Sequence, residues 1–211
     1  MSTFNNVTEK HTHTIAISAT DTWFGFSIAR NLLTDCGGYR HHITIRCLTK
    51  NPNSKPVERL RCLGGEIHEV DYNDEKSLDA ALHNAHYLVF VIEENEKRVK
   101  EANCLAKAAE KNDVNNVIVS SMEGAGDGHG QILRDFREVE KTFKETARSV
   151  VILRSAFIQQ AMFLWSHSIE EKGEIIMTPG EKDEFAPFNL EDLFNAIKDI
   201  MIQEGKVREE I

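Results

Sequence analysis

The sequence predicts an α/β fold: a doubly wound, mostly parallel sheet with helices on both faces, in three αβα layers. Between about residues 14 and 153, short apolar segments alternate with longer segments whose apolar residues recur three and four positions apart. The chain has 211 residues, 41% of them hydrophobic, which is enough for one sizeable core and hardly for two. We therefore expect a single domain over 1–211, with its core at 14–154 and a partial C-terminal portion at 155–211.

Six segments are short and rich in Ile, Val, Leu and Thr, which is typical of buried strands. They lie at 14–18, 43–48, 66–70, 87–91, 116–120 and 149–153. The segments between them have helical spacing, at 25–33, 56–63, 75–85, 96–111 and 131–146. Pro56 near the start of its helix, and Asn73 and Asp74 before the next helix, are typical start signals. Farther along the pattern weakens, and we expect an aromatic-bearing helix, a strand and a closing helix at 157–165, 174–177 and 190–203.

The composition excludes several classes of protein. Acidic residues outnumber basic ones, 34 to 25, and no basic face is concentrated, so nucleic-acid binding is not expected. The longest apolar run, at 87–92, is far too short to span a bilayer, and the N-terminal residues are polar with no apolar signal core. We therefore expect a soluble, non-secreted, cytoplasmic protein without membrane contact, with access to the nucleus left open.

The cysteines and histidines give no sign of a disulfide framework or a metal site. There is no C-x-x-C pair, so we expect reduced thiols at Cys36, Cys47, Cys62 and Cys104. Cys47 lies in a predicted strand and is expected to be a small buried hydrophobe. Two histidine pairs have no third ligand at a suitable spacing, so we expect no metal at His11, His13, His41 or His42.

Residues 14–33 have the order strand, turn, helix, which is the context in which a glycine-rich turn binds phosphate. Ser18 and Asp21 stand where the first two glycines of a dinucleotide-binding turn would be, and Gly25 serves as the third, with one extra residue in the turn. A carboxylate near a diphosphate is repulsive unless it turns away, for example to cap the helix. The turn is therefore either a functional phosphate loop or a simple helix cap with Trp23 and Phe24 packed over it.

The ends of the second and third strands bear on which dinucleotide would bind. An acidic residue after the second strand favours NAD(H), whereas a cation there favours the 2′-phosphate of NADP(H). The charge present is Lys50, so NADP(H) is favoured over NAD(H), unless Lys50 is a solvated loop charge. After the third strand, Asp71 and Tyr72 are placed to hydrogen-bond and flank an adenine, although Asp71 could instead cap the next helix.

Several segments together resemble the NmrA-like family of atypical short-chain dehydrogenase/reductases, most closely fungal members with a degenerate first turn. They are ISATDTWFG, TIRCLTKNP, VDYNDEKSLDAAL, IVSS, ILRSAFIQQ and FAPFNLEDLFNAI. The resemblance runs from about residue 14 to 200. It places Arg154 at the end of the sixth strand and Asp192 at the acidic position of a later segment.

The resemblance implies a Rossmann-like fold with a dinucleotide site. It assigns this site to Ser18, Thr20, Asp21, Phe24, Gly25, Thr49, Lys50, Asp71, Tyr72, Val91, Ile92, Ser120 and Ser121. Family members usually continue into a C-terminal part that covers the substrate site, and here that part is largely absent. Either the protein is truncated, or it binds its ligand through an exposed cleft, or a partner protein completes the site.

The usual acid and base of such reductases are missing. These enzymes use a tyrosine to pass a proton to the carbonyl oxygen and a lysine four residues on. All three tyrosines, Tyr39, Tyr72 and Tyr87, lie before the fourth predicted helix. Many NmrA-like members keep a lysine four residues before a helical glutamate. Counting back from Glu140 gives Phe136, and the neighbouring Arg137 is expected to lie off the required face.

Two weak substitutes for the missing acid are His129 and Ser121. His129 has a side chain that titrates near neutrality, and Ser121 could polarise a carbonyl. His129 lies in the glycine-rich segment 123–130, EGAGDGHG, which is either a flexible loop or a phosphate loop without the Lys-Ser/Thr pair that such loops use.

Three functions follow as hypotheses. The first is a module that binds NADP(H) without turnover and conveys cofactor state to a partner. The second is an NADP-dependent reductase or isomerase with an atypical acid, and the third is a scaffold that binds no dinucleotide because Asp21 and the lost glycines have closed the site. Phe157, Phe163 and Trp165 either pack on the sheet or form an exposed patch for a homodimer or another protein.

Overall fold

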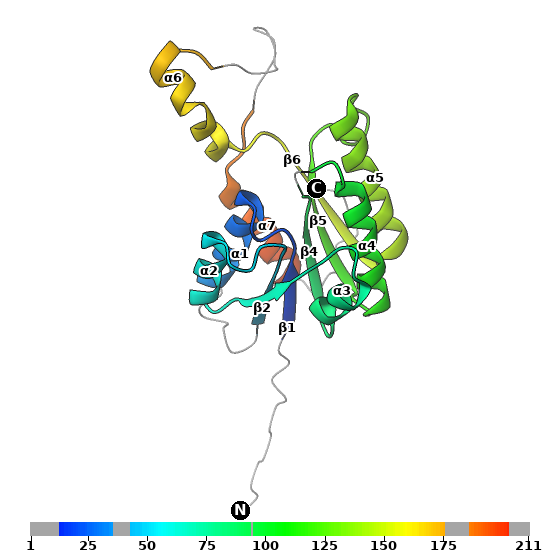
Figure 1. Cartoon of the computed structure of the whole chain (residues 1–211). Helices are drawn as coiled ribbons and strands as arrows, with labels where there is room; N and C mark the ends of the chain where they lie inside the picture. Colours follow the sequence, from blue (N-terminus) through cyan, green and yellow to red (C-terminus); the bar gives the residue numbers. More distant parts are fainter. Residues whose placement is uncertain (1–12, 36–42, 94, 176–185, 203–211) are drawn as a thin grey trace, which may run out of the picture.

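The computed structural model describes residues 13–35, 43–93, 95–175 and 186–202, and it has a six-stranded sheet at its centre (Figure 1). All strand pairs are parallel, in the order β3-β2-β1-β4-β5-β6. The strands are β1 (His13–Ile17), β2 (Ile43–Thr49), β3 (Glu66–Glu69), β4 (Tyr87–Val91), β5 (Asn116–Met122) and β6 (Ser149–Ser155). The strand order reverses between β1 and β4, which is where a ligand crevice forms in such sheets.

Helices cover both faces of the sheet, as the sequence predicts (Figure 1). One face carries α1 (Trp23–Asp35), α2 (Lys55–Cys62) and α7 (Leu190–Ile202). The other carries α3 (Glu75–Leu82), α4 (Arg98–Lys111) and α5 (Gln131–Thr146). The prediction of a doubly wound, three-layer α/β fold is therefore confirmed.

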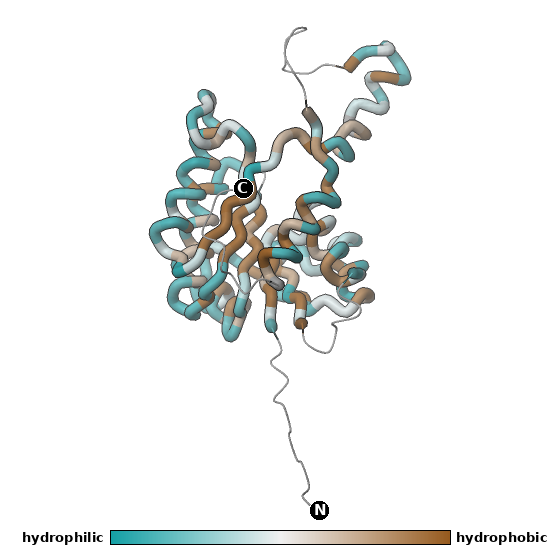
Figure 2. The backbone as a smooth tube through the Cα atoms, turned by 180° about the vertical axis from the view of Figure 1, so that it is seen from behind, coloured by the Kyte–Doolittle hydropathy of each residue, from teal (hydrophilic) through white to brown (hydrophobic). Residues whose placement is uncertain are grey.

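The core consists of two apolar layers, one on each side of the sheet. Every residue of β4 is buried, because this strand has neighbours on both edges and helices on both faces. Figure 2 shows the strands as an apolar centre, surrounded by helices in which hydrophilic and hydrophobic residues are mixed. Phe90 and Phe143 meet in the layer under α5, with ring centroids 4.7 Å apart. Burying a side chain of this size contributes about 1.5–3 kcal/mol.

The helix starts follow local signals in the sequence. Pro56 lies in the first turn of α2 after the N-cap Ser54, and the Asp74 carboxylate accepts a hydrogen bond from the Lys76 N–H at the start of α3. Helix α3 ends at Leu82, earlier than predicted, because Asn84 adopts a left-handed backbone conformation.

The segment after β6 differs from the prediction. In place of one helix at 157–165 there is a 3-10 helix, η2 (Gln159–Trp165), followed by α6 (Ser166–Lys172), which has no buried residue and projects away from the sheet (Figure 1). Glu174 and Ile175 are not in a strand, and the rest of the strand predicted at 174–177 lies outside the described residues.

The sequence left open whether the three aromatic residues pack on the sheet or form an exposed patch. Phe157 and Trp165 contact each other, with ring centroids 5.1 Å apart, while Phe163 is 53% exposed. The spacing of these residues is helical, and their ring contacts are with other aromatic side chains. Phe163 contacts Trp23 from the first turn.

Cys47 is fully buried in β2, as predicted, and burial raises the pKa of its thiol to about 12. Within the described ranges, no group of three His, Cys, Asp or Glu side chains is placed to hold a metal ion. None of the helices described there is long and apolar enough to span a membrane. Cys36, His11, His41 and His42 lie outside the described residues.

Candidate functional site

The turn after β1 is tied to the strands on both sides of it. The Ser18 hydroxyl donates to the Val91 carbonyl at 3.0 Å and accepts from the Val91 N–H at 2.8 Å, which joins β1 to β4. The Thr20 hydroxyl donates to the Leu48 carbonyl of β2 at 3.0 Å. Both side chains are buried. They fix the shape of the turn, and their hydroxyls are already engaged.

Gly25 allows α1 to approach the turn closely. A Cβ atom at this position would lie 2.2 Å from the Ala19 carbonyl oxygen, so no other residue fits without movement of the backbone. Ala19 itself has a φ of 52°, a conformation that favours glycine. The structure therefore gives Gly25 the packing role predicted for the third glycine of the turn.

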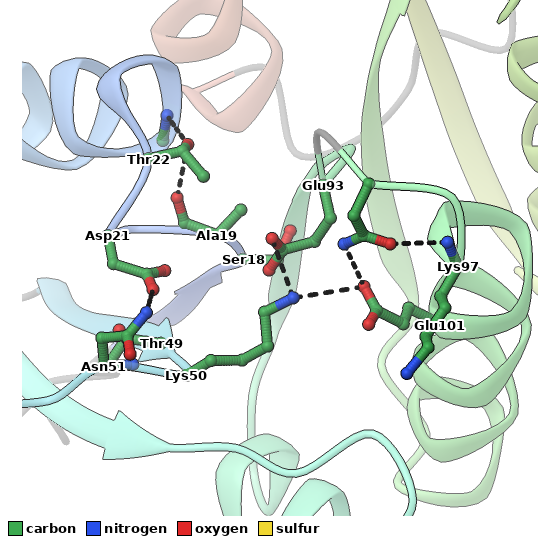
Figure 3. A network of polar contacts seen from close by, with 12 residues as sticks. Ser18, Ala19, Asp21, Thr22, Thr49, Lys50, Asn51, Glu93, Lys97 and Glu101 are labelled. Atoms are coloured by element: carbon green, nitrogen blue, oxygen red, sulfur yellow. Dashed lines mark hydrogen bonds and ion pairs between the residues drawn. The ribbon is translucent and has the colours of Figure 1, made fainter.

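The N-cap of α1 is Thr22. Its hydroxyl accepts a hydrogen bond from the Gly25 N–H at 3.2 Å and donates to the Ala19 carbonyl at 2.8 Å (Figure 3). Asp21 therefore does not cap the helix, which was one way for its carboxylate to turn away from a diphosphate. Since the first amides of a helix have no intrahelical acceptor, the N–H groups of Trp23 and Phe24 form the positive end of the α1 dipole here.

Asp21 turns instead toward the end of β2. One carboxylate oxygen, Oδ2, accepts from the Asn51 side-chain amide at 2.6 Å. The other, Oδ1, is buried and has no hydrogen-bond partner within the described part of the chain. The Thr49 hydroxyl accepts from the Asn51 N–H at 3.0 Å, so Asn51 joins the two turns.

Lys50 is neither a solvated loop charge nor a free cation. Its ammonium lies 3.1 Å from a Glu93 carboxylate oxygen and 3.4 Å from Glu101 Oε2 (Figure 3). It also lies 5.5 Å from the centroid of the Tyr72 ring. Glu93 follows β4 and Glu101 lies in α4, so this ion-pair cluster spans the reversal point of the sheet.

The charges in the cluster shift one another's titration. Burial raises the pKa of Glu93, although the Lys50 ammonium opposes this by favouring the carboxylate. Partial burial disfavours the charged form of Lys50, but the Glu93 and Glu101 carboxylates outweigh it and raise the pKa of Lys50. Lys50 is therefore charged at neutral pH and tightly held.

Asp71 and Tyr72 lie in the turn after β3. The Asp71 carboxylate accepts from the backbone and side-chain nitrogens of Asn73 at 2.8 and 3.1 Å, so Asp71 shapes the turn and does not cap α3. Tyr72 is 6% exposed, and its hydroxyl has no hydrogen-bond partner among the described residues. Burial, with the nearby Glu93, Glu101 and Asp21 carboxylates, raises its pKa well above 10.

Lys50, Asp71 and Tyr72 border a cavity of about 730 Å³ beyond the ends of β2 and β3, which we call the polar cavity. It is lined by Lys50, Asp71, Tyr72, Asn95, Glu96 and Glu101, with four further residues. A second cavity, of about 470 Å³, lies beyond the ends of β4, β5 and β6, and we call it the apolar cavity. Its main lining residues are Trp23, Phe24, Val91, Ile92, Met122, Ile132, Phe136 and Phe157, with Ser120, Ser121 and Glu93.

Ser121 and Arg154 are engaged by one buried carboxylate. The Ser121 hydroxyl donates to Glu140 Oε1 at 2.5 Å, and the Arg154 guanidinium donates to both Glu140 oxygens at 3.0 and 2.7 Å. Such a two-point contact fixes the geometry of both side chains. Ser121 lines the apolar cavity, but its proton is held by Glu140 in this arrangement.

Neither weak candidate for a catalytic acid is free and correctly placed. His129 is exposed and does not line the apolar cavity, and Phe136 lines it at the position where many family members have lysine. Within the described chain, the lining of the apolar cavity includes no Tyr, Lys or His. Tyr39 lies outside the described residues, and Tyr87 donates to the Met201 carbonyl at 3.2 Å.

Arg137 turns away from the apolar cavity, as predicted, and holds the glycine-rich loop 123–130. Its guanidinium donates to the carbonyls of Ala125 and Gly128 at 2.7 and 2.9 Å. Gly128 is required for this packing, because a Cβ there would lie 2.5 Å from the Gly124 carbonyl oxygen. The loop is thus held against α5 through its backbone carbonyls.

Glu93 and Glu101 were not among the site residues predicted from the sequence. Glu93 is the second residue after β4, so the rule that ligands lie beyond the carboxyl ends of strands was a usable signal. Glu101 gave no such signal. It lies within an amphipathic helix, 51 residues from Lys50, and only the crossing order of the strands brings the two together.

The strand order and the crevice at its reversal define this chain as a Rossmann-type protein. It belongs to the NmrA-like family, and the match covers residues 12–173.

Similar solved structures include an NADPH-dependent quinone oxidoreductase from Escherichia coli complexed with NADPH, at 20% identity and a TM-score of 0.77, covering 93% of this chain and 67% of that one. A triphenylmethane reductase from Citrobacter sp. complexed with NADP(H) has 18% identity and a TM-score of 0.76, covering 93% and 68%. A nucleoside-diphosphate-sugar epimerase from Staphylococcus aureus has 14% identity and a TM-score of 0.77, covering 94% and 69%. At these identities the likeness establishes the fold.

Proposed function

We propose that this protein binds NADP(H) in the crevice between β1 and β4, without the tyrosine–lysine chemistry of related reductases, and acts as a regulatory, redox-responsive module. The observation that carries the proposal is the juxtaposition of the two cavities. Glu93 lines the apolar cavity and contacts Lys50, which lines the polar cavity, while the start of α1 lies at the same edge of the sheet. A dinucleotide needs such a sequence of polar, anion-binding and apolar sites.

The residues present fit a dinucleotide at several points. Two buried polar atoms, Asp21 Oδ1 and the Tyr72 hydroxyl oxygen, have no partner among the described residues, and ribose hydroxyl groups could satisfy them. The first-turn amides of α1 would face the diphosphate, and Lys50 would face the 2′-phosphate. NADP(H) is the favoured form because Lys50 is the charge at the end of β2 and because two of the similar structures hold NADP(H).

We propose that bound NADPH is not turned over because of the side chains that line the apolar cavity. Bound NADPH would supply a hydride, and a carbonyl substrate would also need a proton. The apolar cavity offers no Tyr, Lys or His within the described chain, and the Ser121 hydroxyl is donated to Glu140. The side chains there can bind and orient an apolar ring and exclude water from it. The carboxyl group in this lining, Glu93, is paired with the Lys50 ammonium at 3.1 Å, which favours its carboxylate form over a proton-donating acid.

The regulatory role is supported by the mouth of the apolar cavity. Trp23, Met122 and Ile132 line this cavity and are 42%, 40% and 53% exposed. Exposed apolar side chains of this size are typical of contact surfaces. We propose that a protein partner contacts them and thereby distinguishes the occupied from the empty crevice.

Calorimetric titration with NADPH and NADH, followed by an assay of NADPH oxidation with a quinone, tests the proposal. We expect saturable NADPH binding and no oxidation above the rate without protein. Oxidation that is lost in His129→Ala would establish an enzyme with an atypical acid and contradict the proposal. Failure of both dinucleotides to bind at millimolar concentration would also contradict it and would favour a scaffold closed by Asp21.

A further inference from the structure

We infer that Glu101, on α4, is a specificity-determining residue that competes with a 2′-phosphate for Lys50 and so limits the preference of the site for NADP(H) over NAD(H). The inference rests on the proposed function. Its starting point is that the single cation at the end of β2 is already paired in the structure, with carboxylates at 3.1 and 3.4 Å (Figure 3).

Glu101 is held in position to do this. Its side chain is 12% exposed, and the same oxygen that contacts Lys50, Oε2, accepts a hydrogen bond from the Asn95 side-chain amide at 3.0 Å. Asn95 is itself fixed, because its Oδ1 accepts from the Lys97 N–H at 2.6 Å. The carboxylate is therefore a preorganised partner for Lys50, which remains 32% exposed toward the polar cavity.

The competition acts on only one of the two dinucleotides. A 2′-phosphate must approach Lys50 and share it with, or take it from, the carboxylates, and it also meets their negative charge. A 2′-hydroxyl carries no charge, so it leaves the Lys50 ion pairs intact. Removing the Glu101 charge should therefore strengthen binding of NADPH selectively.

Glu101 is a better test position than Glu93. Glu93 is the nearer carboxylate, but it also lines the apolar cavity, so its replacement would change two sites at once. Glu101 does not line that cavity. Glutamine at 101 keeps the side-chain shape and an oxygen for Asn95.

The experiment is a calorimetric titration of the full chain with NADPH and NADH for wild type, Glu101→Gln and Glu96→Gln. Glu96 is the matched control, because it is exposed and lines the same polar cavity, so its replacement removes the same charge. We expect Glu101→Gln to lower the Kd for NADPH about fivefold, which corresponds to about 1 kcal/mol, and to change that for NADH less than about twofold. Glu96→Gln should leave the ratio of the two Kd values near the wild-type ratio.

A second variant separates capture of Lys50 from a general effect of charge. In Lys50→Met/Glu101→Gln the gain in NADPH affinity should disappear. Equal tightening of both dinucleotides, an equal effect of Glu96→Gln, or a gain that survives Lys50→Met would overturn the inference while leaving the proposed function in place. Absence of binding of either dinucleotide to any of these proteins, with folding verified by circular dichroism, would overturn both.

Discussion

At the scale of single residues, the turn after β1 depends on the absence of a side chain at Gly25. We expect Gly25→Ala to destabilise the protein by about 1–3 kcal/mol or more, because the added methyl group would overlap the Ala19 carbonyl oxygen. Urea unfolding measures this. Gly126→Ala is the control, because the nearest atom there, Arg154 Nη1, is 3.4 Å away, and it should cost far less. Equal midpoints for the two variants would contradict the close packing of α1 on the turn.

Cys47 provides a second prediction at this scale. Because burial raises the pKa of its thiol to about 12, almost no thiolate is present at pH 8, and the side chain is also inaccessible. Brief treatment of the folded protein with iodoacetamide should therefore modify the exposed Cys62 and leave Cys47 intact, as read by mass spectrometry of peptides. In urea, both should react. Labelling of Cys47 at the rate of Cys62 in the folded protein would show that β2 is not packed as described.

At the scale of elements, Arg137 of α5 gives the glycine-rich loop 123–130 two hydrogen bonds through its guanidinium. We expect Arg137→Gln to speed amide hydrogen exchange in this loop about tenfold, because two hydrogen bonds from a charged donor are lost. The strand β4 should be unaffected. Arg134→Gln is the matched control, since the Arg134 guanidinium contacts Gln131 in the same helix. Unchanged exchange in the loop of Arg137→Gln would contradict the anchoring role.

The regular elements could be predicted from the sequence because each satisfies a local rule. The residues of β4 are apolar without interruption, as a strand buried on both faces requires, and α3 has its own cap at Asp74. The segment after β6 could not be predicted. Its aromatic residues have helical spacing, but Phe163 contacts Trp23, which is distant in the sequence. Local sequence patterns do not predict such a contact.

At the scale of the whole molecule, the fold places the candidate site more reliably than it assigns the roles of its residues. Gly25 and Lys50 were predictable, because their positions follow directly from the strand–turn–helix order and from the end of β2. Their partners were not predictable. Lys50 meets Glu101 because β1 and β4 are neighbours in the sheet, and Thr22 rather than Asp21 caps α1.

The fold also places one tryptophan where its fluorescence can report binding in the crevice. The chain has two tryptophans, Trp23 and Trp165, and Trp23 begins α1 and lines the apolar cavity. In Trp165→Phe, all tryptophan emission comes from Trp23. Trp165 contacts Phe157 in the structure, so phenylalanine keeps an aromatic contact there.

Titration of Trp165→Phe with NADPH, following the emission of Trp23, tests the central claim most directly. We predict a saturable decrease in emission, with a Kd equal to that from calorimetry, because a dinucleotide in the crevice would lie against the start of α1 and accept the excitation energy of Trp23. A linear decrease, equal to that of free N-acetyltryptophanamide in the same NADPH solutions, would show that no dinucleotide binds beside α1, and would contradict the account.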